Sequence, residues 1–257
     1  MKLTTAVFAA LLSIASAVPQ PQVIDLGDGV KLIPRKPRRH RHSRPKLPTS
    51  EASIKAITNN THAEYSTNWA GAILPGSYKS VTGTITYAAS AWVGIDGYTC
   101  SQPIIQTGID VYVQGGAVHY DAWYEWWPAL AYSFDGFSVG TGDSVTMTVT
   151  ASSSSAGTVT LKNNSKGKTV THSFSGEAVK LCQAEAEWII EDFQLQGQLV
   201  PFANFGTVSF TGASATGSDG CAVGVSGSRV INLKKDNKVL TSCSTSGPNT
   251  FKCSYVS

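Results

Sequence analysis

The sequence lacks the motifs that mark several classes of site. Its 257 residues contain no G-x-x-x-x-G-K, no H-E-x-x-H and no paired C-x-x-C spacing. Neither a phosphate-binding loop nor a usual zinc site is indicated, so we predict no metal and no cofactor. Beyond the N-terminus there is no long uninterrupted apolar run, which excludes a membrane span. No stretch combines helical periodicity with a cap at each end.

The first seventeen residues have the order of a secretory signal peptide. A basic start at Lys2 precedes an apolar run, and Ala15-Ser16-Ala17 supplies a small-residue cleavage site. This order is typical of signal peptides that are removed. We therefore predict cleavage after Ala17 and a secreted, extracellular product.

Residues 18–58 form a second N-terminal segment, rich in Pro, Arg and His. Residues 18–55 hold nine Lys and Arg against three Asp and Glu, whereas residues 56–257 hold ten against fourteen. A basic arm can bind nucleic acid or act as a solvated linker. Behind a signal peptide and beside an acidic domain, a removable propeptide that inhibits the domain fits better. Acid would protonate the paired carboxylates, which predicts a pH-triggered release.

Residues 59–257 have the length of one domain and a composition rich in Ser, Thr, Gly, Val and aromatics. Short alternating runs separated by turn residues predict antiparallel hairpins in an all-β sandwich, and we expect a monomer. The predicted strands are 81–87, 90–95, 104–113, 117–126, 144–151, 158–162, 169–174, 185–193 and 207–211, with a hairpin tip at 162–168.

Five cysteines in a secreted chain predict disulfides and leave one thiol over. Cys243 and Cys253 flank a turn-rich stretch and are expected to pair. Asn59 and Asn163 stand in Asn-x-Thr and Asn-x-Ser sequons, which predicts glycosylation. The histidines at positions 62, 119 and 172 are far apart, and each is interpreted as a surface or strand residue.

Residues 184–193 alternate acidic with apolar side chains. In a strand, this order would place Glu185, Glu187 and Glu191 on one face, with Trp188 on the other. Carboxylates held on a rigid apolar strand often have shifted pKa values and serve as acids or bases. A solvent-facing polar strand is the alternative.

Two further segments are rich in potential site residues. Aromatic and acidic residues occupy both faces of 120–128, so part of this stretch is expected to line a groove that grips a sugar or a peptide. Gln106 lies in the apolar run 104–110, where a buried amide requires hydrogen-bond partners.

Six motifs, in one order, resemble the fungal glutamic peptidases, the eqolisins. They span roughly residues 65–257 and are Asn68-Trp69-Ala70-Gly71-Ala72-Ile73, Trp92-Val93-Gly94-Ile95-Asp96-Gly97 with Cys100, Ile105-Gln106-Thr107-Gly108, the segment Tyr120 to Pro128, Ala186-Glu187-Trp188-Ile189-Ile190-Glu191-Asp192-Phe193, and Val200-Pro201-Phe202-Ala203.

The resemblance implies a secreted acid endopeptidase that acts on polypeptides. Its fold would be an antiparallel sandwich of two large sheets, of the concanavalin-like or jelly-roll type, with a concave substrate groove. The family's catalytic glutamine matches Gln106 and its glutamate matches Glu187. Its disulfides match Cys100 with Cys182 and Cys243 with Cys253, which leaves Cys221 as the odd thiol. The remaining substrate-binding candidates are Trp69, Asp96, Asp110, Asp121, Trp123, Glu125 and Glu191.

The implied chemistry is coherent. Ionised Glu187 would activate water as a general base and return the proton to the leaving amine, while Gln106 would stabilise the oxyanion. Hydrogen bonds to the carboxylate would favour its ionised form, and burial would oppose it. A glycoside hydrolase using Glu125 and Glu187 and a lectin-like sugar-binding module are the alternatives. Neither alternative gives Gln106 an essential role.

Overall fold

The computed structural model describes residues 24–25, 31–32, 41–42, 45–47, 64–86, 90–114, 117–195, 198–199 and 202–256. Within these ranges every regular element is a strand, and therefore no helix long and apolar enough to cross a membrane is present there. The all-β prediction is confirmed. The predicted signal peptide and the Asn59 sequon lie outside the described residues, as does His62.

The first large sheet has nine strands in the order β10-β9-β8-β7-β14-β5-β19-β20, with β4 beside β19. All its pairings are antiparallel except the parallel pair of β4 with β19. The bounds are β4 Glu64–Ser66, β5 Trp69–Pro75, β7 Ala91–Ile95, β8 Ile104–Gln114, β9 Ala117–Trp127, β10 Tyr132–Ser133, β14 Glu185–Glu191, β19 Arg229–Lys235 and β20 Lys238–Val239.

The second large sheet has eight strands in the order β13-β12-β11-β6-β17-β22-β21, with β18 beside β17. Its bounds are β6 Tyr78–Ile85, β11 Val145–Ser153, β12 Ala156–Asn163, β13 Lys168–Phe174, β17 Thr207–Gly217, β18 Ala222–Gly224, β21 Thr241–Thr245 and β22 Phe251–Tyr255. Two small sheets join β1 Ile24–Asp25 to β2 Lys31–Leu32, and β3 Arg41–His42 to β15 Gln194–Leu195 and β16 Gln198–Leu199.

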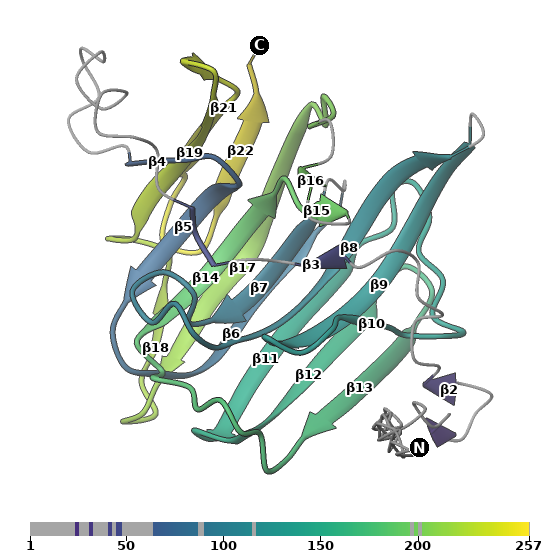
Figure 1. The fold of residues 1–257 in the computed structure, drawn as a ribbon, viewed down its shortest axis with the longest axis vertical. Helices are drawn as coiled ribbons and strands as arrows, with labels where there is room; N and C mark the ends of the chain where they lie inside the picture. Colours follow the sequence, from purple (N-terminus) through teal and green to yellow (C-terminus); the bar gives the residue numbers. More distant parts are fainter. Residues whose placement is uncertain are drawn as a thin grey trace, which may run out of the picture.

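The main hydrophobic core lies between the two large sheets, whose strands run in similar directions, as in an aligned sandwich (Figure 1). Trp188 of β14 is fully buried in this core with Val81 of β6 and Met147 of β11. The indole Nε1 of Trp188 donates a hydrogen bond to the carbonyl of Thr82 at 2.8 Å. The two sheets are thus joined by apolar packing and by this hydrogen bond.

A second buried cluster covers the opposite face of the nine-stranded sheet. It contains Trp69 and Ile73 of β5, Trp92 of β7, Trp123 of β9 and Ile189 of β14. Alternation along the strands explains the division, because the residues between these positions belong to the main core. The sheet is therefore apolar on both faces, and polar residues between the tryptophans are removed from water.

The structure contains the two disulfides that the resemblance implied, Cys100–Cys182 and Cys243–Cys253, and Cys221 is a free, exposed thiol. The predicted hairpin tip is also present, because β12 pairs with β13 on either side of it. All nine predicted strands overlap strands of the structure.

Asn163, the second predicted glycosylation site, lies in the hairpin of β12 and β13. Its side chain is fully buried, and its Nδ2 donates to the carbonyl of Ser138 at 3.1 Å and to Oδ2 of Asp143 at 2.8 Å. Its Oδ1 accepts the N–H of Lys166 at 3.1 Å. A glycan on Nδ2 would have to replace these contacts, and glycosylation at this sequon stays a prediction.

His172 of β13 gives a stability prediction. Its ring stacks on Tyr124 with centroids 4.1 Å apart, and burial lowers its pKa below 6.5. The unfolded chain therefore binds a proton more readily, and the stability cost appears as the pH falls below 6.5. We expect His172→Phe to raise the free energy of unfolding more at pH 4 than at pH 7.5, measured by urea denaturation. An equal gain at both pH values would contradict the idea; His119→Phe is the control.

Candidate active site

One row of residues crosses the nine-stranded sheet on the face opposite the main core. Gln106 on β8 pairs directly with Gly94 on β7, and Gly94 pairs directly with Glu187 on β14. The row continues to Glu125 on β9, which pairs with Gln106, and to Ile73 on β5, which pairs with Glu187. Directly paired residues of antiparallel strands point their side chains to the same face. The strand register therefore brings Gln106 and Glu187 to one side of the sheet.

Gly94 separates Gln106 from Glu187 and has no side chain to stand between them. A Cβ atom at this position would lie 2.9 Å from Cζ3 of Trp92 and 3.3 Å from Cβ of Gln106. Two strand spacings put the flanking backbones roughly 10 Å apart, a gap that a glutamine and a glutamate can span together. Any side chain at position 94 would therefore collide with the Trp92 ring, and the glycine places no side chain of β7 between Gln106 and Glu187.

Glu187 is fully buried, and neither of its carboxylate oxygens has a hydrogen-bond partner among the described residues. Burial raises the pKa of Glu187 well above 4.5, and the negative charges of Glu185 and Asp96 add to the shift. Hydrogen bonds to the carboxylate would lower this pKa and burial raises it, and burial therefore dominates. Glu187 holds its proton more firmly than an ordinary glutamate does.

The other two carboxylates of β14 have different surroundings. Glu185 and Glu191 are 1% and 3% exposed, so the alternative of a solvent-facing strand is wrong. Glu185 accepts hydrogen bonds from the backbone N–H of Thr99, at 3.1 Å, and from its hydroxyl. Glu191 accepts one from Nε1 of Trp92 at 3.1 Å. Within the described part of the chain, Glu187 is the β14 carboxylate with both oxygens unpartnered.

The Gln106 amide hydrogen-bonds to the neighbouring strand. Its Nε2 donates to Oε2 of Glu125 at 2.9 Å, and both residues are buried. Oε1 of Gln106 has no partner in the described ranges. A primary amide has two N–H donors and one oxygen acceptor. Gln106 therefore has one N–H committed to Glu125 and keeps one N–H and its oxygen for another group.

Asp96 fixes the loop that leads into β14. In the left-handed conformation (φ 69°), it accepts hydrogen bonds from three consecutive backbone N–H groups, those of Cys182, Gln183 and Ala184, at 2.8, 2.9 and 2.7 Å. Burial raises the pKa of Asp96, although these hydrogen bonds oppose the shift. The Cys100–Cys182 disulfide joins the same two loops. Asp96 thus anchors the backbone of the strand that carries Glu187.

The remaining predicted groove residues lie on the same face, beside the row. Nε1 of Trp123 donates to Oδ1 of Asp110 at 3.0 Å, and Asp121 lies directly opposite Asp110, partly buried. Trp69 meets Trp92 edge to face, with ring centroids 5.0 Å apart. Both faces are buried over residues 122–126, where Trp126 belongs to the main core. These side chains support the face on which the row lies.

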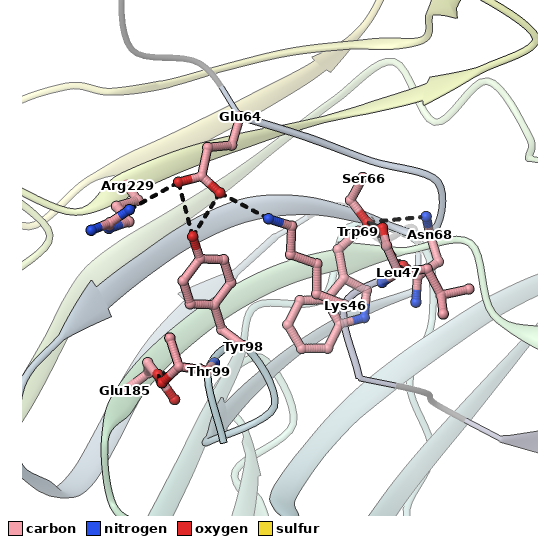
Figure 2. A network of polar contacts seen from close by, with 10 residues as sticks. All are labelled: Lys46, Leu47, Glu64, Ser66, Asn68, Trp69, Tyr98, Thr99, Glu185 and Arg229. Carbon is pink, nitrogen blue, oxygen red and sulfur yellow. Dashed lines mark hydrogen bonds and ion pairs between the residues drawn. The ribbon is translucent and has the colours of Figure 1, made fainter. Parts of the chain in front are cut away.

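Residues 45–47, from the basic N-terminal segment, are hydrogen-bonded to the domain (Figure 2). The N–H of Lys46 donates to the carbonyl of Gly97 at 3.3 Å, and the N–H of Leu47 donates to Oδ1 of Asn68 at 2.8 Å. Both partners belong to segments that flank strands of the row, β7 and β5. The basic segment therefore contacts the domain at the border of the candidate site.

Glu64 lies at the centre of a charged cluster, called here the Glu64 cluster (Figure 2). It accepts hydrogen bonds from Nζ of Lys46 at 2.8 Å, from the hydroxyl of Tyr98 at 2.7 Å and from Nη1 of Arg229 at 3.1 Å. Burial opposes ionisation, but these hydrogen bonds lower the pKa of Glu64 below 4.5. No local pattern could have found this cluster, because its four residues come from four separate segments.

Comparison with known protein families matches residues 67–255 to the Peptidase A4 family. The match covers most of the chain, which therefore belongs to the Peptidase A4 family, that of the eqolisins or glutamic peptidases. The protein is a glutamic endopeptidase, and the alternatives of a glycoside hydrolase and a lectin-like module are overturned.

Two curated relatives are similar over most or all of their length. Aspergillopepsin-2 of Aspergillus niger is 44% identical over 239 residues, which cover 80% of this chain and 84% of the relative. Scytalidopepsin B of Scytalidium lignicola is 39% identical over 275 residues, which cover both chains completely.

Two solved structures share the fold. A scytalido-glutamic peptidase crystallised with a transition state analog inhibitor gives a TM-score of 0.69 at 42% identity, covering 74% of this chain and 98% of that one. The aspergilloglutamic peptidase of Aspergillus niger gives 0.62 at 46% identity, covering 67% and 99%. The similarity thus lies in the sandwich that carries the candidate site.

Proposed function

We propose that this endopeptidase hydrolyses polypeptides with Glu187 and Gln106 as its catalytic pair. The observation that carries the proposal is the direct pairing of both residues with Gly94, which puts both side chains on one face of the sheet with no β7 side chain between them. A scytalido-glutamic peptidase has been crystallised with a peptide-based transition state analog, which supports a polypeptide substrate here.

In the proposed reaction, Glu187 acts first as a base and then as an acid. Its ionised carboxylate takes a proton from water while the water oxygen bonds to the scissile carbonyl carbon. The carbon–nitrogen bond then breaks, and Glu187 returns the proton to the departing amine. No covalent bond to the protein forms. The raised pKa of Glu187 makes its ionised form a stronger base for the first step, and the protonated carboxyl still gives its proton to the far more basic amine in the second.

Gln106 stabilises the oxyanion and orients the attacking water in the proposed reaction. Its free N–H donates to the oxyanion that forms on the carbonyl oxygen, and its Oε1 accepts a hydrogen bond from the attacking water. An amide does not titrate, so this function persists in acid. The same donor would be absent from an ionised carboxylate at this position.

The test of the proposed function is digestion of a denatured protein between pH 2 and pH 6 by the secreted, processed product. An aspartic-peptidase inhibitor is present throughout, and a soluble polysaccharide serves as the control substrate. We expect peptide fragments and no sugar release. Failure to cleave protein anywhere in this range, or abolition of cleavage by the inhibitor, would reject the proposal.

We also propose that residues 1–17 direct secretion and that residues 18–58 are a propeptide that inhibits the domain until processing, the active product being a monomer. The contacts of Lys46 and Leu47 with Gly97 and Asn68 support inhibition, because they lie beside the strands of the catalytic pair. The ion pair of Lys46 with Glu64 supports acid release. Its contribution is present above pH 4.5 and is lost as the pH falls through the lowered pKa of Glu64.

Glu64→Gln is expected to loosen the docked segment at pH 6, with an effect that shrinks as the pH falls through the lowered pKa of Glu64. A partly exposed ion pair typically contributes up to about 1 kcal/mol, so hydrogen exchange of the Lys46 amide should quicken by about two- to fivefold. The measurement is made on the full chain in an inactive Glu187→Gln background. Asp143→Asn is the matched control, because it breaks the pair with Lys166 on the other sheet. An effect as large at pH 3 as at pH 6 would rule out the acid-release role.

A further inference from the structure

Glu125 is the residue that contacts the Gln106 amide directly. It lies directly opposite Gln106 on β9, and its Oε2 accepts the Nε2 hydrogen bond at 2.9 Å. The two side chains are 1% and 0% exposed, so bulk water does not compete for this contact. The other direct partner of Gln106, Gly94 on β7, has no side chain. Residues 104 and 108, on either side of Gln106 on the same face of β8, are Ile and Gly.

The two ends of the amide have opposite hydrogen-bonding capacity, and a half-turn about the last side-chain bond exchanges them. Oε2 of Glu125 is the acceptor of this hydrogen bond, so it selects the orientation in which Nε2 of Gln106 faces Glu125. The opposite orientation would place Oε1 of Gln106 against a carboxylate oxygen, two acceptors in contact in a buried site. The pairing with Glu125 therefore determines which atoms of Gln106 are turned away from β9 and remain unpaired among the described residues.

We propose that Glu125 is a positioning residue, which fixes the Gln106 amide so that one N–H and Oε1 remain available to the reacting groups. This inference rests on the proposed function of Gln106, because the orientation matters only if the amide takes part in the reaction. Glu125 acts through Gln106 and need not contact the substrate. Its loss should therefore lower kcat and leave KM nearly unchanged.

The kinetic experiment compares three variants of the processed enzyme on a quenched fluorescent peptide. Glu125→Leu removes the acceptor, and we expect kcat to fall by about 10- to 100-fold with KM within about twofold, as for a displaced catalytic group. Glu125→Gln keeps an oxygen that accepts the same N–H, and kcat should stay within about fivefold of the wild-type value. Thr107→Val is the control, because it removes a buried hydrogen bond between the same two strands, to the Trp123 carbonyl.

The second measurement does not depend on enzyme activity or on the Glu125→Leu variant. In the inactive Glu187→Gln chain, the side-chain amide of Gln106 is identified by nuclear magnetic resonance as the signal that Gln106→Leu removes. One of its two protons should exchange slowly with solvent, and adding Glu125→Gln should preserve this protection. Adding Glu125→Ala should abolish it.

Three outcomes would overturn the proposal: wild-type kcat in Glu125→Leu, an equal loss in Glu125→Leu and Glu125→Gln, or an unprotected Gln106 amide in the presence of Glu125. The second outcome would assign the effect to the charge of Glu125 rather than to its acceptor oxygen. Failure of the proposed function looks different, because Gln106→Leu would then keep full activity whatever residue stands at position 125.

Discussion

Glu187→Gln is expected to lower kcat for peptide hydrolysis by about 10³- to 10⁴-fold, the upper range for loss of a general acid–base. Glutamine has nearly the shape of glutamate, but it neither takes a proton from water nor returns one to the amine. KM should change little, because the variant retains the volume and polarity of the site. The measurement is kcat and KM of the processed enzyme on a peptide substrate across pH 2–6.

The same variant should be more stable than the wild type at neutral pH. The raised pKa of Glu187 means that the folded chain resists its ionisation, so the wild type carries a stability cost above pH 4.5 that vanishes in more acid solution. Glu187→Gln removes this cost, which predicts a higher melting temperature at pH 7 and no difference at pH 3. Such a result would show that Glu187→Gln does not lose its activity through unfolding.

Glu177→Gln is the matched control for the kinetic measurement, since Glu177 is half-buried in the connection between β13 and β14. It should leave kcat unchanged. A Glu187→Gln enzyme with more than a tenth of the wild-type kcat would exclude Glu187 as the base. A melting temperature below that of the wild type at pH 7 would contradict the buried, unpartnered environment.

Strands are best predicted from the sequence where side chains of different type alternate along the chain, so that each type lies on one face of the strand. The order Glu-Ala-Glu-Trp-Ile-Ile-Glu of β14 assigned each side chain to its observed face, because Trp188 enters the main core while Glu187 does not. β5 was not among the predicted strands. It is buried on both faces, so its Trp-Ala-Gly-Ala-Ile-Leu run is continuously apolar and carries no alternation.

Burial and long-range contacts could not be predicted from local patterns. The carboxylates of β14 resemble a solvent-facing strand until the second apolar cluster is assembled from six separate strands. Asn163 matches a glycosylation sequon, yet the hairpin closes over its amide. The Glu64 cluster depends on four segments that meet only in the fold. The site residues Gln106 and Glu187 were selected by family resemblance, and their common row is a property of strand register.

Gln106→Leu is expected to lower kcat by about 10²- to 10³-fold, the usual effect of removing one donor to an oxyanion. Leucine fills the same volume but neither donates to the carbonyl oxygen nor accepts from the attacking water. Glu125 would lose its hydrogen bond from Nε2, so some loss of stability is expected as well. Gln102→Leu is the matched control, because Gln102 is exposed in the connection before β8.

The double variant Gln106→Leu with Glu187→Gln separates a catalytic pair from two independent residues. Groups that act on one reaction step as a unit have strongly non-additive effects. Without a base to activate water, the donor from Gln106 has little developing charge to stabilise, so the double variant should be about as slow as Glu187→Gln alone. If instead the kcat losses of the two single variants multiply in the double variant, Gln106 acts outside the step catalysed by Glu187, as in substrate binding. In that case KM would rise in Gln106→Leu.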